Sequence, residues 1–154
     1  MVRGRFLAAA ALLAAALTGC ASAPRLSAGP ALSKSRGRVR FEKTADGGTR
    51  ILMRVENLAE PEGFDPPGYA YVAWVQSSRE AAAQNVGALI VDDYRTGVLR
   101  TTTVLRDFEL FVTVEATSDS PKPTGPPLLW ARRVDPDALA SRRVDARFAP
   151  DAGL

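Results

Sequence analysis

Apolar and polar residues alternate along much of this chain with a period of two. The alternation runs through residues 39–43 and again through residues 51–55, and the residues Asp46-Gly47-Gly48 lie between the two runs. Successive side chains of a β-strand point to opposite faces of a sheet, and Asp-Gly favours a tight turn. The pattern therefore predicts a β-hairpin with one buried face.

Five further segments have the composition of strands. The run from Tyr69 to Gln76 carries aromatic and β-branched residues on both faces, which predicts a central strand that is covered on each side. The other four expected strands are residues 86–91, 98–105, 108–116 and 128–134. In the segment 108–116 the apolar residues share one face, so we expect that face to be core, and the face of Glu109, Thr113 and Glu115 to be wet.

Seven short strands with turn signals between them predict an all-β fold. We expect an antiparallel β-sandwich of the immunoglobulin type, with a β-barrel as the alternative. The Pro-rich segment 58–68 should be a loop that crosses between the sheets. One or two turns of helix are expected at residues 77–85, and Asp135-Pro136 predicts either a short C-terminal helix or a frayed tail over residues 135–154.

The first twenty residues have a different pattern. Basic residues at positions 3 and 5 precede an apolar run over residues 6–17, which is too short to span a membrane, and Leu17-Thr18-Gly19-Cys20 follows. This arrangement resembles the signal of bacterial lipoproteins. The resemblance implies that residues 1–19 are a signal peptide and that Cys20 carries lipid on its sulfur and its amine. The alternative is an ordinary secretory signal, cut after Ala21 or Ala23.

The lipoprotein resemblance also implies a location. The protein would be anchored in the bacterial cell envelope through Cys20. Ala21, rather than Asp, follows the cysteine, which favours the outer membrane facing the periplasm over the inner membrane.

Residues 20–37 are predicted to form a flexible tether, because they are rich in small residues, Pro and Gly and have no apolar periodicity.

Without the signal peptide the chain carries 18 basic and 17 acidic side chains. The excess lies in one cluster, which consists of Arg25, Lys34, Arg36, Arg38 and Arg40. It would either contact anionic lipid headgroups or be solvated. With this charge placed outside the folded part, we expect no binding of nucleic acid.

The chain has no His, and Cys20 is its only Cys. This excludes Ser-His-Asp and Cys-His catalysis, the usual zinc and copper ligand sets and an intramolecular disulfide. The remaining candidates are hydroxyls and carboxylates, in Asp92-Asp93, Glu115 and Ser118-Asp119-Ser120. Nothing in the sequence places two carboxyl groups the roughly 5 to 9.5 Å apart that glycoside hydrolysis needs, and no calcium-loop pattern is present. We expect no enzyme activity, no cofactor and no metal.

Aromatic residues are the candidates for binding, since they dominate both cores and interaction hot spots. Trp74 and Phe108 are expected in the core. Phe111 falls on the predicted wet face of its strand, so either a second layer covers it or it belongs to an exposed patch that meets a partner. Phe111 and Tyr71 are therefore the predicted binding residues, and Tyr69 and Trp130 are further candidates.

Several blocks occur in an order that is similar to the C-terminal domain of the anti-sigma-K factor family. They are the run from Tyr69 to Trp74, then Val112-Thr113-Val114-Glu115, then Ser120-Pro121 and Pro123-Thr124-Gly125-Pro126 ahead of an apolar strand. The resemblance covers about residues 39–134 and implies an extracytoplasmic domain. Ala116 and Thr117 depart from it, because the family more often has Pro and Ala there. Family members also carry a sigma-binding segment and a transmembrane helix, for which this chain has a signal and an anchor.

The sequence thus predicts a lipid-anchored envelope protein with a non-enzymatic binding domain over residues 38–134. Its expected partners are the membrane, through the lipid, and another envelope protein. One alternative is an accessory regulator that contacts a membrane-spanning regulator in anti-sigma signalling. Another is a carboxylate-dependent hydrolase.

Overall fold

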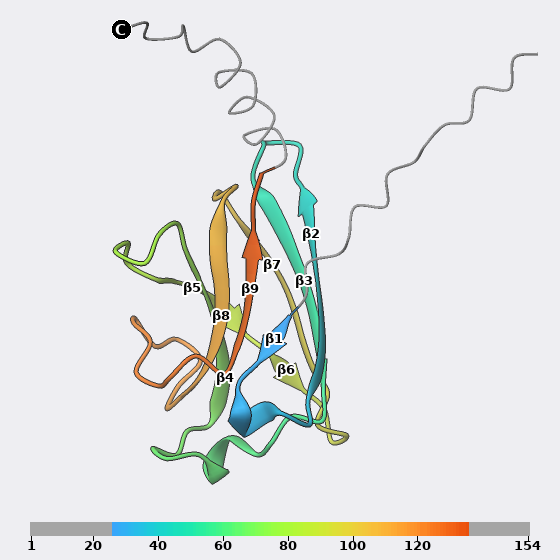
Figure 1. Ribbon diagram of the computed structural model, residues 1–154, viewed down its shortest axis with the longest axis vertical. Helices are drawn as coiled ribbons and strands as arrows, with labels where there is room; N and C mark the ends of the chain where they lie inside the picture. Colours follow the sequence, from blue (N-terminus) through green and yellow to red (C-terminus); the bar gives the residue numbers. More distant parts are fainter. Residues whose placement is uncertain (1–25, 136–154) are drawn as a thin grey trace, which may run out of the picture.

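A computed structural model of the protein describes residues 26–135, which form two packed β-sheets (Figure 1). The elements in chain order are β1 (Ser27–Ala28), the 3-10 turn η1 (Pro30–Leu32), β2 (Arg36–Lys43), β3 (Thr49–Glu56), the 3-10 turn η2 (Pro61–Gly63), β4 (Ala70–Gln76), β5 (Gln84–Ala88), β6 (Ile90–Val91), β7 (Gly97–Thr103), β8 (Phe108–Glu115) and β9 (Leu129–Arg133). The predicted signal peptide, Cys20 and the residues of the predicted C-terminal helix beyond Asp135 lie outside the described part. Within residues 26–135, no helix is long and apolar enough to cross a membrane.

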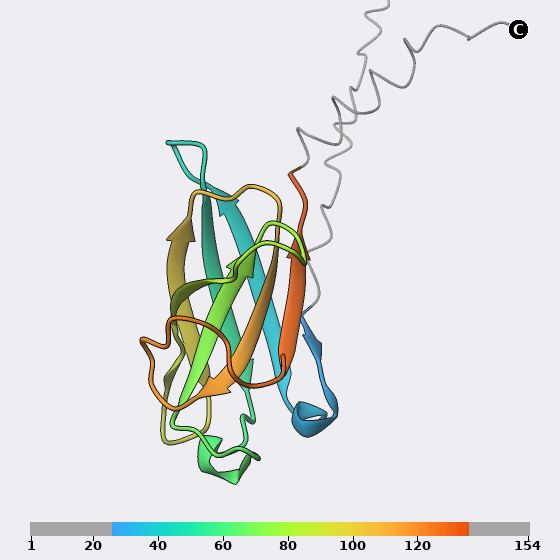
Figure 2. The ribbon, with the colours of Figure 1, turned by 90° about the vertical axis from the view of Figure 1, so that its left-hand side faces the viewer.

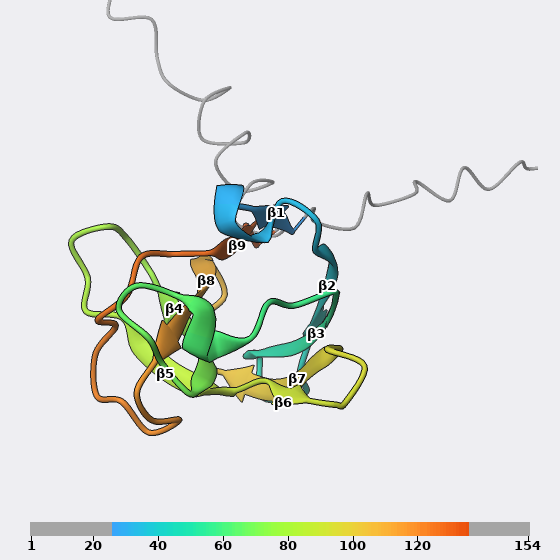
Figure 3. The same cartoon turned by 90° about the horizontal axis from the view of Figure 1, so that it is seen from below.

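The two sheets confirm the predicted antiparallel β-sandwich. One sheet has the order β1-β9-β8-β4-β5 and the other β2-β3-β7-β6, and every neighbouring pair is antiparallel. Figures 2 and 3 show the two layers from the side and from below. Counted from β2 as the first strand, this is the immunoglobulin order, with strands A, B, E and D in one sheet and C, F and G, extended by C′, in the other.

The predicted hairpin is formed by β2 and β3. Phe41 pairs with Ile51 and Val39 with Met53, and these side chains point toward the second sheet. The backbone of Gly47 has a φ of 84° in the connecting turn, which glycine adopts without strain. The loop between β3 and β4 crosses from one sheet to the other, as its prolines predicted.

The predicted strand over residues 86–91 is divided between the two sheets. β5 pairs with β4, whereas β6 pairs with β7 in the other sheet. Leu89 makes the transition: its side chain is buried and its N–H donates to the carbonyl of Tyr71 at 2.8 Å. The apolar residues on each side of Leu89 pack in different sheets. The apolar periodicity of the sequence does not show at which residue the chain passes from one sheet to the other.

The helix expected at residues 77–85 is wrong. The chain there forms bends and turns, and Gln84 and Asn85 already belong to β5. A run of three alanines is too short to nucleate a helix in competition with a sheet edge. Gln84 instead pairs with Val75 of β4.

Residues 26–37 do not belong to the predicted tether, because they are part of the folded sandwich. β1 pairs with β9, and Leu32 of η1 is buried in the main core. Leu26 packs on Gly37, where an added Cβ would stand 2.1 Å from the leucine Cδ2. Only two leucines, Leu26 and Leu32, pack this segment on the sandwich. Two apolar residues are too few to produce an apolar periodicity that the sequence would reveal.

The position of the basic cluster changes with the tether. Arg36 was expected in the tether and Arg38 and Arg40 at the start of the folded domain, and all three lie in β2. The premise that the basic excess lies outside the folded part is therefore wrong.

The main core lies between the sheets, and β8 contributes its predicted inner face of Phe108, Leu110, Val112 and Val114. The opposite face of β8 was expected to be exposed to solvent, and this prediction is wrong. Phe111, Thr113 and Glu115 are all buried. A second layer on this side of the sheet is required to bury them.

Replacing Val112 with alanine should lower the free energy of unfolding by roughly 2 kcal/mol, because the side chain is fully buried and its removal leaves a cavity. The matched control is Val104→Ala, since Val104 is 81% exposed and should change stability by less than about 0.5 kcal/mol. Urea unfolding monitored by circular dichroism measures both. Similar losses in the two variants would contradict the inward orientation of Val112.

Candidate functional site

The second layer over the five-stranded sheet is the Pro-rich loop between β8 and β9, residues 116–128. Figure 2 shows this orange segment running across β4 and β8 on the side away from the other sheet. Beneath it Val72, Trp74 and Phe111 form a small apolar cluster of their own. Of the two possibilities for Phe111, the structure shows the covered one.

A hydrogen-bond network joins the loop to the sheet. The indole N–H of Trp74 donates to the hydroxyl oxygen of Thr113 at 2.8 Å, and the Thr113 hydroxyl donates to the carboxylate of Glu115. The same carboxylate accepts the N–H of Thr124 at 3.0 Å, the Thr124 hydroxyl and the N–H of Gly125 at 3.5 Å. Glu115 was predicted to be a solvated acid, but it is the buried acceptor on which the loop converges.

The protonation state of Glu115 follows from two opposing effects. Burial raises the pKa of the carboxyl group, and the hydrogen bonds from Thr113, Thr124 and Gly125 lower it. The hydrogen bonds prevail, so the pKa of Glu115 lies below its usual value. The side chain is therefore charged at neutral pH and binds donors more strongly than a neutral amide would.

Asn85 of β5 holds the first half of the loop. Its amide nitrogen donates to the carbonyls of Ser118 and Ser120, both at 3.0 Å, while its amide oxygen accepts the N–H of Gly87 at 2.8 Å. At the other end, an added Cβ at Gly125 would stand 2.9 Å from the carbonyl oxygen of Val114, so only glycine allows this close approach. The loop is thus fixed at both ends.

A hollow of about 450 Å³ lies between the fixed loop and strands β8 and β9. Its apolar lining comes from Phe111 and Trp130, which are paired across the strands, and from Pro123 and Pro127 of the loop. Trp130 is 44% exposed. The polar lining residues are Gln76, Arg79, Glu109 and Arg132. This volume, together with a mostly apolar lining that includes a few polar side chains, is typical of sites that bind a small molecule or a short peptide segment.

The two predicted binding residues have different outcomes. Phe111 lines the hollow, although it is only 9% exposed. Tyr71 is a core residue: it is buried, its hydroxyl donates to the carbonyl of Ala59 at 2.8 Å, and burial raises its pKa. The prediction for Tyr71 is wrong because its side of β4 is the inner one. Trp130, one of the further aromatic candidates, is the more accessible aromatic of the hollow.

The other candidate acids and hydroxyls lie in turns and loops that their hydrogen bonds stabilise. Asp92 accepts the N–H groups of Tyr94 and Thr96 at 3.0 and 2.8 Å, so it stabilises the turn between β6 and β7. Ser118 and Ser120 are held by Asn85. In the part of the chain that the structure describes, no three His, Cys, Asp or Glu side chains lie close enough together to hold a metal ion.

The chain matches no model of a known protein family and none of the curated proteins with which it was compared. The resemblances to bacterial lipoproteins and to the anti-sigma-K factor family stay predictions from the residues. The blocks that carry the second resemblance meet at the network, since Val112 to Glu115 supply its acceptor and Pro123 to Pro126 include its donors.

Replacing Glu115 with glutamine should lower the free energy of unfolding by about 1 to 3 kcal/mol at pH 7, because a neutral amide is a weaker acceptor and brings an unpaired N–H₂ group. A carboxyl group with a depressed folded-state pKa stabilises above its unfolded pKa of about 4.3, and this contribution is lost as the pH falls through the folded pKa. The difference between wild type and variant should therefore shrink on acidification toward pH 3.

Urea unfolding at pH 7 and pH 3 measures this difference. Glu60→Gln is the control, because Glu60 is exposed in the β3–β4 loop and should cost almost nothing at either pH. If the Glu115→Gln variant is as stable as wild type at neutral pH, the carboxylate does not hold the loop.

Proposed function

We propose that the protein is a lipid-anchored protein of the bacterial cell envelope whose β-sandwich binds another envelope protein without catalysing a reaction. The binding site is the hollow lined by Phe111 and Trp130. The observation that carries this proposal is the exposure of Trp130 beside a wall of prolines that the Glu115 network holds in place. An aromatic side chain in a preformed apolar hollow binds without first having to be ordered.

The chemistry of the hollow supports binding over hydrolysis. Glu109 is the only acidic residue among those that line it, all of which lie in the described part of the chain. A hydrolase with paired carboxylates needs a second carboxyl group within reach of the first. Glu115 does not serve, because its side chain is buried and its oxygens already accept several hydrogen bonds.

The second candidate is an accessory role in envelope anti-sigma signalling, through contact with a membrane-spanning regulator. It is favoured by one observation, which is that the last block resembling the anti-sigma-K family lines the hollow with Pro123 and Gly125, and that Glu115 of an earlier block holds it in place. Both candidates use the same site. A neighbouring gene for a sigma or anti-sigma factor would favour the signalling role, and a stable partner of another kind would favour the first.

The anchor is tested at Cys20, because its thiol is the only one in the chain that can form a thioether with lipid. Cys20→Ser should abolish palmitate labelling and shift the protein from the membrane to the soluble fraction or leave it unprocessed. The control is Ser22→Ala, two positions later, which should label like wild type. A Cys20→Ser protein that still incorporates palmitate would disprove the lipoprotein assignment.

The binding site is tested with Trp130→Ala. The variant should capture at least tenfold less of the protein that the wild-type chain captures from envelope extracts, as expected for a hot-spot aromatic. Its melting temperature should fall by less than that of Phe111→Ala, because nearly half of the Trp130 side chain is exposed whereas Phe111 is buried. Phe111→Ala is less informative, since this buried ring also supports the sheet.

Tyr94→Ala is the matched control for this capture experiment. Tyr94 is an aromatic residue that is 87% exposed in the turn between β6 and β7, and it is not among the residues that line the hollow. Its replacement should leave capture unchanged. If Tyr94→Ala and Trp130→Ala reduce capture equally, the hollow is not the binding site.

A further inference from the structure

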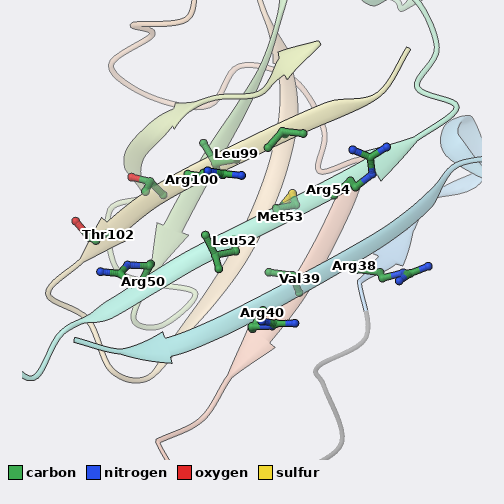
Figure 4. A pocket seen from close by; sticks show the side chains of 12 residues that line it. Arg38, Val39, Arg40, Arg50, Leu52, Met53, Arg54, Leu99, Arg100 and Thr102 are labelled. Carbon is green, nitrogen blue, oxygen red and sulfur yellow. The ribbon is translucent and has the colours of Figure 1, made fainter. Parts of the chain in front are cut away.

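The outer face of the four-stranded sheet carries six arginines on three adjacent strands. Figure 4 shows five of them with Leu52 among them. Arg38 of β2 lies directly opposite Arg54 of β3, and Leu52 lies between Arg40 and Arg100. Together with Arg36 and Arg50 they form the arginine face: Arg36, Arg38, Arg40, Arg50, Arg54 and Arg100. All six are exposed, and most of them border an open depression of about 920 Å³.

Two glutamates on this face lie at its ends. Glu42 pairs with Arg50 at 3.6 Å and with Arg40 at 3.7 Å, while Glu56 accepts from Arg54 at 3.2 Å. Within residues 26–135, no ion pair forms at Arg38 or Arg100. The middle of the face therefore presents uncompensated positive charge.

This arrangement does not help the fold. Like charges directly opposite on neighbouring strands are destabilising, and Arg38 and Arg54 are such a pair. Charged residues on an edge strand protect it from pairing with other chains, which would account for the arginines of β2. β3 and β7 are interior strands, so edge protection does not explain Arg54 or Arg100.

The described chain begins at the strand that carries three of these arginines. Leu26 packs on Gly37 of β2, on the core side of the strand, and Gly37 lies between Arg36 and Arg38, which point outward. Cys20 is only six positions before Leu26, a separation of at most about 20 Å. A lipid on Cys20 would thus hold β2 close to the bilayer, where an anionic surface attracts charge over a screening length of about 8 to 10 Å.

We propose that the arginine face binds the anionic phospholipid headgroups of the membrane in which Cys20 is anchored. This inference rests on the lipid anchor of the proposed function. Guanidinium groups bind phosphate through paired hydrogen bonds, and a polybasic surface commonly supplements a lipid anchor. A broad face with an apolar residue at its centre and cations around it suits a planar anionic surface.

The test uses the chain from residue 21 to residue 154, which carries neither lipid nor signal peptide and keeps both sheets, since these lie within residues 26–135. It should sediment with vesicles of equal parts phosphatidylglycerol and phosphatidylcholine and not with phosphatidylcholine alone. Binding should weaken as the salt concentration rises from about 0.05 to about 0.5 M. The double variant Arg38→Gln, Arg100→Gln should bind roughly 25-fold more weakly, at about fivefold for each charge removed.

The matched control is the double variant Arg95→Gln, Lys122→Gln, which removes the same net charge from two loops outside the arginine face. It should bind within about threefold of wild type. Circular dichroism melts should show that both double variants stay folded, because all four residues are exposed.

Three results would overturn the proposal. They are equal binding to neutral and anionic vesicles, equal losses in the two double variants, and binding to duplex DNA or heparin without binding to the anionic vesicles. Because these proteins lack lipid, the outcome does not depend on whether Cys20 is acylated. Failure of palmitate labelling would refute the anchor alone, and failure of vesicle binding would refute the arginine face alone.

Discussion

The charged hydrogen bonds of Glu115 hold the outer layer of this protein in place. The loop of residues 116–128 has no strand or helix of its own, and its prolines lack the N–H groups with which to pair along a sheet. Asn85 holds its first half, and its second half stays on the sheet because one buried carboxylate accepts the N–H groups of Thr124 and Gly125. The same carboxylate receives the Thr113 hydroxyl, whose oxygen in turn satisfies the indole of Trp74. A single ionised group thereby closes the second apolar cluster and sets one wall of the hollow.

The two outer faces of the sandwich differ in polarity and in whether a loop covers them. The five-stranded sheet has an apolar outer face under a covering loop, with an aromatic hollow beside it. The four-stranded sheet has a bare outer face whose alternate positions are mostly charged. The two sheets pack face to face (Figure 3), so their outer faces point in opposite directions. The hollow lies on the outer side of one sheet and the arginine face on the outer side of the other. A domain that rests on a membrane by one of them presents the other to the surrounding compartment.

Sequence reasoning recovered the elements that obey a local period. The hairpin, the inner face of β8 and the sandwich itself all follow from alternation and turn residues. The division at Leu89, the attachment of residues 26–37 and the burial of Thr113 and Glu115 did not, because each depends on a partner distant in the chain. Thr124 is nine positions from the carboxylate it binds, and Trp130 is paired with β1, more than a hundred residues earlier. Polar residues on one face of a strand indicate either solvent or a polar layer, and the sequence of that strand alone does not distinguish them.

The short reach from Cys20 to Leu26 changes what an anchor can do. A flexible tether over all of residues 20–37 would let the domain rotate freely above the bilayer and would average out any preferred face. Because Leu26 already packs on β2, lipid at Cys20 would restrict both the height and the orientation of the domain. Each arginine would then act near the surface instead of at a distance at which salt has screened its charge. The proposed anchor and the arginine face would therefore reinforce each other, since the first would raise the local concentration of headgroups for the second.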